Sequence, residues 1–419
     1  MVTGRTHRAI EAAWRIDAPR IIAAVARMTG DVGTAEDFAQ DALVAALRAW
    51  PEQGVPDNPG AWLMATAKRR AIDFIRRGRM LDRKHEEVAY EIGEDTGSPE
   101  DAIHESIDDD VGDDLLRLIF TACHPVLSTE ARVALTLRLL GGLTTEEIAR
   151  AFLAPVPTVA QRIVRAKRTL AEARVPFDVP RAEERAARLG SVLEVIYLIF
   201  NEGYAATSGD TWMRTDLCDE ALRLARVLAG LMPQESEVHG LAALLELQAS
   251  RARARVDADG NPVLLMDQDR SRWDRLLIQR GLASLERAQQ LTDTLGPYTL
   301  QGAIAACHAR ARTPGETDWE RIVALYDALT EITQSPVVAL NRAVAVAMAY
   351  GPEAGLALID DIADEPALRS YHLLPAARAD LLHRLGRDAE AVRELERAAS
   401  MTQNDRERTL LLDRAAAWR

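Results

Sequence analysis

Cysteines, aromatic residues and long apolar runs are scarce in this sequence of 419 residues. The three cysteines, Cys123, Cys218 and Cys307, lie far apart, which excludes a disulfide scaffold and a thiolate zinc knuckle and fits a reducing cytoplasm. No apolar run approaches the roughly 20 residues that span a bilayer. The segment Met1 to Ile10 lacks the apolar core of a signal peptide. We therefore expect a soluble cytoplasmic protein with no membrane partner.

Patterns typical of strands are nearly absent as well. No segment shows sustained alternation of apolar and polar residues rich in Val, Ile, Thr and aromatics. Ala, Leu, Arg and Glu dominate, and apolar residues recur at spacings of three and four. With 48% apolar and 27% charged residues, the composition is that of a globular protein and not of a disordered chain. We predict an all-α fold.

The charge is segregated along the chain, whose net charge is −13. Residues 86–114 contain 13 acidic residues and no Lys or Arg, so this stretch alone accounts for the net charge. Residues 60–84 hold eight basic against two acidic residues, and residues 157–174 hold five against one. A charge run alone is often only a solvated surface. Two basic blocks around an acidic stretch predict two small modules joined by a linker.

The first module is predicted to contain three helices, at 9–29, 34–50 and 61–77. The second begins at Thr34 as N-cap and ends at Pro51. Its apolar stripe is expected to be Phe38, Leu43, Leu47 and Trp50, with Glu36, Asp37, Gln40 and Asp41 on the other face. A non-helical loop with three prolines covers 51–60. The third helix is expected to bury Trp62, Leu63, Ala67, Ile72 and Ile75.

The second module is predicted to end in a helix-turn-helix unit. Helices are expected at 115–124 and 128–140, followed by 144–152, a turn of about four residues and 157–173. Thr144 and Glu147 have the spacing of a capping box, and Pro157 suits a first helical turn. The last helix is expected to bury Val159, Ile163, Ala166 and Leu170. Helical hairpins of this kind also occur in proteins that bind no DNA, but Arg and Gln side chains can read base edges and Lys can hold phosphates.

These features occur in an order that resembles one protein family. TAEDFAQDALVAALRAW (34–50) and GAWLMATAKRRAIDFIRR (60–77) resemble sigma region two of bacterial sigma factors, and residues 115–174 resemble sigma region four. Two such modules without a region three resemble the extracytoplasmic-function group. The resemblance implies a region-two module at 1–82, an acidic flexible linker at 83–114 and a region-four module at 115–178.

The resemblance also implies partners and residue roles. The chain would bind core RNA polymerase through Glu36, Asp37, Gln40 and Asp41. It would bind the promoter −10 element through Trp62, Lys68, Arg69, Arg70, Arg76 and Arg77. Trp62 would be either a stacking platform for a flipped base or a core residue, and Arg69 stands where the family commonly has Asn. The −35 element would be bound through Thr158, Gln161, Arg162, Arg165, Lys167 and Arg168. The linker would either mimic nucleic acid in the channels of the polymerase or serve as a plain tether.

The last part of the chain, 185–419, is expected to form a helical-repeat-like domain. The segments at 351–354 and 386–389 share Gly and Ala at a spacing of 35 residues, and residues 371–400 read as helix, Gly turn and helix. This part resembles tetratricopeptide repeats, which stack helix pairs through small residues.

Two polar segments in this domain do not read as plain repeat. FNEGYAATSGD (200–210) and DQDRSRWD (267–274) resemble signature segments of extracytoplasmic-function sigma factors with a large C-terminal helical extension. Their polar residues would form either a regulatory contact surface, which would bind a regulator, a small ligand or the sigma modules themselves, or the ion pairs and caps that hold an irregular domain together. The residues in question are Asn201, Glu202, Tyr204, Asp267, Asp269, Arg270, Arg272, Trp273 and Asp274.

The leading hypothesis is an alternative sigma factor that directs core polymerase to promoters, with the C-terminal domain regulating activity in cis. It requires no cofactor, no metal and no catalytic residue. A stand-alone helix-turn-helix regulator with a helical sensor domain is the first alternative, and an enzyme with its site in the C-terminal domain is the second. No phosphate-binding loop, nucleophile elbow or His-rich metal spacing supports the enzyme.

Overall fold

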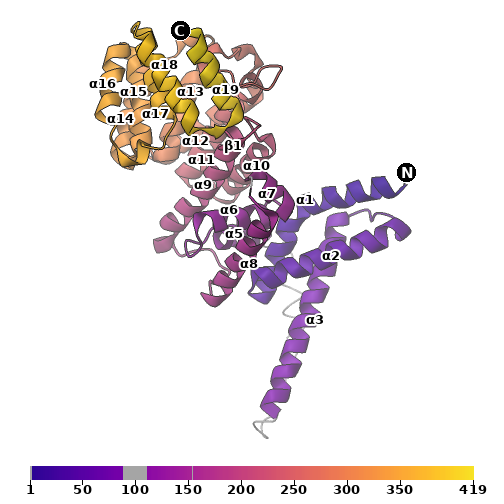
Figure 1. Cartoon of the computed structure of the whole chain (residues 1–419). Helices are drawn as coiled ribbons and strands as arrows, with labels where there is room; N and C mark the ends of the chain where they lie inside the picture. Colours follow the sequence, from indigo (N-terminus) through magenta and orange to yellow (C-terminus); the bar gives the residue numbers. More distant parts are fainter. Residues whose placement is uncertain (1, 88–110, 153) are drawn as a thin grey trace. The chain divides into compact units, whose positions relative to one another are not determined.

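The computed structural model describes residues 2–87, 111–152 and 154–419, and these are almost entirely helical (Figure 1). The prediction of an all-α fold is confirmed. Among the described residues the only strands are β1 (Ser208–Gly209) and β2 (Gln403–Asn404), which pair in parallel. None of the described helices has the length and apolar character that crossing a bilayer requires. The chain divides into two compact units, Met1–Val195 and Ile196–Arg419, and the division falls inside helix α9 (Ala182–Tyr204).

The first unit begins with helices α1 (Val2–Thr29), α2 (Val32–Gln53) and α3 (Pro59–Glu87), which pack against one another. The predicted N-cap of α2 is wrong: Asp31 is the cap, and its Oδ1 accepts the N–H of Thr34 at 2.6 Å. Pro51 does not end the helix, because the chain continues through Gln53 until Gly54 adopts a φ of 89°. The predicted loop 51–60 therefore shrinks to residues 54–58.

The buried face of α2 is made mostly of alanines, which corrects the predicted apolar stripe. Leu47 is exposed, and Phe38 and Leu43 are only half-buried, whereas Trp50 is in the core as predicted. Because alanine side chains are small, the alanine-rich face of α2 can pack close to the neighbouring helices. Its buried residues are Val32, Ala35, Glu36, Ala39, Ala42, Ala46 and Trp50.

The set of fully buried residues on α3 also differs from the prediction. Leu63, Ala67 and Ala71 are buried, and Trp62, Ile72 and Ile75 are half-buried.

The helix-turn-helix prediction is confirmed in the second part of this unit. Helices α5 (Val111–Ala122) and α6 (Thr129–Leu139) precede α7 (Thr145–Ala151) and α8 (Val156–Glu172). The capping box is present, since Glu147 N–H donates to Thr144 Oγ1 at 3.1 Å and Thr144 N–H donates to Glu147 Oε2 at 2.8 Å. The buried side chains of α8 are the four predicted ones, Val159, Ile163, Ala166 and Leu170.

The acidic segment predicted as a linker, 83–114, is only partly described. Residues 83–87 belong to α3 and residues 111–114 to α5. The remaining positions, 88–110, lie outside the described residues.

The second unit is built from helices that contact mainly their neighbours in sequence. Contacts link α10 to α11, α11 to α12 and to α13, and then each helix to the next from α13 to α19, as Figure 1 shows for α17, α18 and α19. Such packing is typical of helical-repeat proteins. The helix, Gly turn and helix expected at 371–400 are α17, Gly386 with a φ of 71° and α18. The likeness to tetratricopeptide repeats stays a prediction. The helices are α10 (Thr215–Leu231), α11 (Ser236–Ala249), α12 (Arg275–Leu291), α13 (Pro297–Arg310), α14 (Trp319–Thr333), α15 (Pro336–Tyr350), α16 (Pro352–Asp361), α17 (Leu373–Arg384), α18 (Asp388–Met401) and α19 (Asp405–Ala417).

One asparagine joins the two ends of this unit. The Asn404 side chain is fully buried, and its Nδ2 donates to the carbonyl oxygens of Ala206 and Thr211 at 3.0 and 2.9 Å. Its Oδ1 accepts the N–H groups of Arg406 and Glu407 and so caps α19. The short pairing of β1 with β2 is fixed at the same place.

Candidate nucleic-acid and polymerase interfaces

The four residues of α2 that are predicted to bind core polymerase differ in their exposure to solvent. Asp37 and Asp41 are exposed, and Gln40 is half-buried. Asp41 pairs with Arg70 of α3, whose Nη1 lies 2.6 Å from its Oδ2. Glu36 is only 3% exposed and belongs to the buried set. In this arrangement three of the four predicted residues are accessible and Glu36 is not.

Glu36 is held by cations from two other helices. The Nε of Arg138 on α6 lies 2.6 Å from its Oε1, and the ammonium of Lys167 on α8 pairs with its Oε2. The amide of Gln40 donates to Oε1 at 2.5 Å. Burial raises the pKa of Glu36, but the two cations outweigh it and hold that pKa below its usual value. The carboxylate therefore stays ionised in a nearly dry environment.

The residues predicted to engage the −10 element all lie on α3. Trp62 is half-buried, with its ring edge-on to Trp50 at 5.4 Å between centroids. Half-burial leaves part of the ring accessible and part in the core, and a stacking role for Trp62 stays a prediction. The Arg77 Nε donates to the carbonyl of Asp73. The basic side chains of this face include the half-buried Lys68 and Arg70 and the exposed Arg69, Arg76 and Arg77.

The residues predicted to engage the −35 element lie on the face of α8 away from its core. Arg168 pairs with Glu172 one turn on at 2.6 Å, and both side chains are well exposed. Val164 was not among the predicted residues, but it is 63% exposed among the basic residues and leaves an apolar side chain on this surface. Its helical spacing from Gln161 and Arg168, three before and four after, was the available signal. Of the six predicted residues, the exposed ones are Thr158, Gln161, Arg165 and Arg168, and the half-buried ones are Arg162 and Lys167.

Further contacts join the two modules of the first unit. Helix α1 packs against α5, where Arg27 Nε lies 3.2 Å from Asp114 Oδ2. Arg15 of α1 pairs with Glu147 of α7 at 3.2 Å, with the Arg15 side chain exposed. These pairs connect helices of the predicted region two with helices of the predicted region four.

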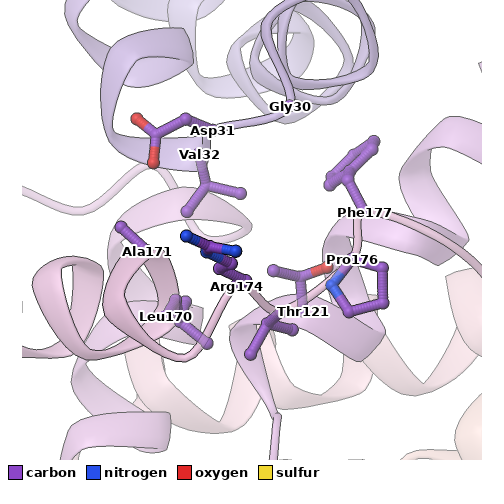
Figure 2. A pocket seen from close by; sticks show the side chains of 10 residues that line it. Gly30, Asp31, Val32, Thr121, Leu170, Ala171, Arg174, Pro176 and Phe177 are labelled. Carbon is purple, nitrogen blue, oxygen red and sulfur yellow. The ribbon is translucent and has the colours of Figure 1, made fainter.

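A pocket of about 420 Å³ lies at the same junction, between the α1–α2 loop and the end of α8. Figure 2 shows the exposed Arg174 side chain among the residues that line it. Arg174 adopts a φ of 48°, in the left-handed region that a non-glycine residue rarely occupies. The lining comprises Gly30, Asp31, Val32, Thr121, Leu170, Ala171, Arg174, Val175, Pro176 and Phe177.

Several of the C-terminal residues predicted as a contact surface have structural contacts. Glu202 pairs with Arg214, Asp269 caps a short helical turn, and Asp274 caps α12 by accepting the N–H groups of Leu276 and Leu277. Arg270 is buried and donates to the carbonyl oxygens of His308 and Ala311. These contacts match the alternative of ion pairs and caps. Trp273 is in the core, Asn201 and Tyr204 are half-buried, and Asp267 and Arg272 remain exposed.

Two arginines that sequence analysis missed surround Tyr204. The Arg255 guanidinium lies 3.6 Å from the centre of the Tyr204 ring, and Arg251 donates to the Tyr204 hydroxyl at 2.7 Å. Burial, partly offset by Tyr204, lowers the pKa of Arg255. The Arg255 contact is a cation–π interaction and the Arg251 contact a hydrogen bond, and both join segments about 50 residues apart, which no local pattern reveals.

Comparisons with known proteins match both modules. The model Sigma-70 region 2 matches residues 15–80, Sigma-70, region 4 matches 117–170, and a family of unknown function (DUF6596) matches 188–289. A Rhizobium meliloti (strain 1021) protein, itself uncharacterized, is 43% identical over 403 residues, which cover 95% of this chain and 94% of that protein. The probable ECF RNA polymerase sigma factor SigI of Mycobacterium tuberculosis is 29% identical over 181 residues, covering 43% of this chain and 60% of SigI.

The matched ranges lie within α1–α3 and α5–α8, so the presence of a region-two and a region-four module is confirmed, while their bounds at 1–82 and 115–178 stay predictions. The chain therefore belongs to the extracytoplasmic-function sigma factors, as a member with a C-terminal helical extension.

Proposed function

We propose that this protein directs core RNA polymerase to a specific set of promoters and promotes initiation, in the cytoplasm and without chemistry of its own. The observation that carries the proposal is the match of both sigma modules, each with an accessible basic helix. Such a protein supplies base recognition, and the binding energy of the polymerase complex drives strand opening.

We assign the −35 contact to the exposed face of α8. Arg165 is exposed, projects from the helix beside Gln161, and is free of any ion pair among the described residues. An arginine contact to a guanine edge or a phosphate contributes about 1–3 kcal/mol. Arg165→Ala should therefore reduce promoter use about 5- to 150-fold while leaving core polymerase binding unchanged.

Run-off transcription with core polymerase tests this assignment, together with a direct measurement of core binding. Arg253→Ala, which removes an exposed arginine of the second unit, is the matched control and should transcribe like the wild type. Equal loss of core binding and transcription by Arg165→Ala would contradict a role at the promoter. Tight sequence-specific duplex binding by the chain alone would favour a stand-alone regulator instead.

We assign to the second unit the regulation of activity in cis. A truncation that tests this must retain the first part of α9, because that part belongs to the first unit. Arg188 Nη2 donates to the Phe120 carbonyl at 3.0 Å, and Ser191 Oγ donates to the Cys123 carbonyl at 2.6 Å. A chain ending at Val195 keeps these bonds. A change in run-off transcription in either direction, at unchanged core binding, would support regulation in cis, and equal activity would contradict it.

A further inference from the structure

Three arginines of the second unit lie against two aromatic rings. The guanidinium of Arg255 lies 3.6 Å from the centre of the Tyr204 ring, and the guanidinium of Arg251 lies 5.8 Å from it. Arg251 is also 5.8 Å from the centre of the Trp273 ring, which has the Arg270 guanidinium at 5.0 Å. Cations and rings therefore alternate. We call these five residues, Tyr204, Arg251, Arg255, Arg270 and Trp273, the arginine cluster.

The arginine cluster joins the two polar segments that do not read as plain repeat. Tyr204 belongs to the first segment, FNEGYAATSGD, and Trp273 belongs to the second, DQDRSRWD. Arg251 follows helix α11 and lies near both rings, so it connects the two segments. A site at this place would draw on residues from both of them.

The three guanidiniums of the arginine cluster form no ion pair among the described residues. They donate instead to neutral oxygens, which are the Tyr204 hydroxyl and carbonyl, the Gln248 side chain, the His308 and Ala311 carbonyls and the Thr317 hydroxyl. Burial, and then repulsion from Arg251, lower the pKa of Arg270, and the charge of Glu316 offsets this only partly. Buried positive charge without an opposite charge is unfavourable, so an added anion would stabilise this part of the fold.

Buried polar atoms that lack a hydrogen-bond partner gather at the arginine cluster and beside it. Five of the twelve such atoms in the described part of the chain lie here, namely Arg255 Nε, Gln268 Oε1, Arg270 Nε, Trp273 Nε1 and His308 Nδ1. Trp273 is 3% exposed and Arg270 is 6% exposed. Both arginine Nε atoms and the indole nitrogen carry hydrogens, so N–H donors outnumber acceptors among these unpaired atoms. A buried donor left unpaired is unfavourable, and an anionic oxygen is the partner that it binds most strongly.

We propose that the arginine cluster binds the phosphate group of a small anionic ligand. Arg251 and Arg255 are only half-buried, so a ligand can reach them from solvent, and they would hold the phosphate oxygens through their guanidinium N–H groups. The buried Arg270 would add its positive charge to the site. A phosphate group carries about two negative charges at pH 7, so it compensates three guanidiniums better than a carboxylate does. No residue assigned to polymerase or promoter takes part, and the proposal therefore goes beyond the proposed function.

Titration of the free full-length chain with inorganic phosphate, pyrophosphate or acetate tests the proposal, at an ionic strength held constant with chloride. We expect the two phosphates to raise the thermal unfolding midpoint along a saturable curve, because a ligand that binds only the folded state stabilises it. A second measurement reports on the site itself. With 5-fluorotryptophan at the seven tryptophans, the fluorine NMR signal of Trp273, identified with Trp273→Phe, should shift over the same range of phosphate concentration.

Substitutions at two nearby arginines separate the site from a general charge effect. Arg251→Gln removes one guanidinium of the arginine cluster and should weaken pyrophosphate binding about tenfold or more. Arg253→Gln removes an exposed arginine two positions away and is the matched control, which should bind within about twofold of the wild type. Arg251→Lys keeps the charge but loses the planar fork, so its affinity should fall between those of the wild type and Arg251→Gln. The lysine variant keeps the comparison informative if glutamine impairs folding.

Three results would overturn the proposal. The first is the absence of a shift of the Trp273 signal up to about 10 mM pyrophosphate, which would saturate a site with a Kd of about 1 mM. The second is binding by folded Arg251→Gln as tight as by Arg253→Gln, which would show a general salt effect. The third is binding of acetate as tight as that of inorganic phosphate, which would contradict the assignment to phosphate. Polymerase and promoter are absent from these measurements, so each of these results leaves the proposed function unaffected.

Discussion

Acid should destabilise the second unit through one buried histidine. His308 of α13 is 9% exposed, its ring lies edge-on to Trp319, and its Nδ1 has no hydrogen-bond partner. Burial, and then the charges of Arg251 and Arg270, lower the pKa of His308 to about 3. The folded chain therefore keeps this imidazole neutral where the unfolded chain protonates it.

The sign and size of the effect follow from linkage. The folded pKa of His308 is depressed below the ordinary imidazole value of 6.5, so between pH 6.5 and pH 3 the unfolded state binds a proton that the folded state does not. The contribution to stability is complete above pH 6.5 and is lost as the pH falls toward 3. The free energy of unfolding falls by about 5 kcal/mol in total once the pH is well below 3, and by about 2 kcal/mol at pH 5.

Urea unfolding at pH 7 and pH 5, for the wild type and for His308→Gln, measures this contribution. Glutamine does not titrate, so the variant should lose about 2 kcal/mol less stability than the wild type between the two pH values. Identical losses in the two proteins would refute the argument, because the pH dependence would then come from other groups.

Two further predictions each compare a pair of positions with opposite environments. Ile163→Ala, which removes a 5% exposed side chain of α8, should destabilise by about 2–4 kcal/mol, whereas Val164→Ala at 63% exposure should stay within about 0.5 kcal/mol; thermal unfolding distinguishes them. Gly203→Ala should lower the free energy of unfolding by about 1–3 kcal/mol, because the added Cβ would meet backbone atoms at 2.7 and 2.9 Å. Gly230→Ala should raise it by about 0.5–1 kcal/mol, because no atom lies within 4 Å of the added Cβ and alanine favours the helix α10. Similar unfolding midpoints within either pair would contradict the packing described here.

Local patterns predicted the helix-turn-helix unit well and the junction between modules poorly. The burial of Ile163 and the capping box at Thr144 follow from helical periodicity and from a spacing of three residues. The sequence pattern puts Glu36 on the polar face of its helix, together with Asp37, Gln40 and Asp41. Its real environment depends on Lys167, which is 131 positions away and lies on another helix, and no periodicity carries that information.

The polar C-terminal segments show the same limit in another form. DQDRSRWD reads equally well as a contact surface or as internal scaffolding, because caps and exposed sites use the same residue types. The structure shows scaffolding contacts for two of its residues. Asp274 caps the start of α12, and Arg270 donates to the carbonyl oxygens of His308 and Ala311. Of the predicted residues in this segment, Asp267, Asp269 and Arg272 are exposed, and a regulatory contact through them stays a prediction.

The buried Asn404 has a consequence for how the second unit folds. An open solenoid folds from any point outward and tolerates the loss of a terminal repeat. Here the Asn404 amide fixes contacts 198 and 193 residues back along the chain, so the array carries a long-range closure of high contact order. During synthesis the sigma modules emerge well before this closure can form. A chain that terminates before Asn404 would therefore carry both sigma modules and an extension that lacks these closing hydrogen bonds.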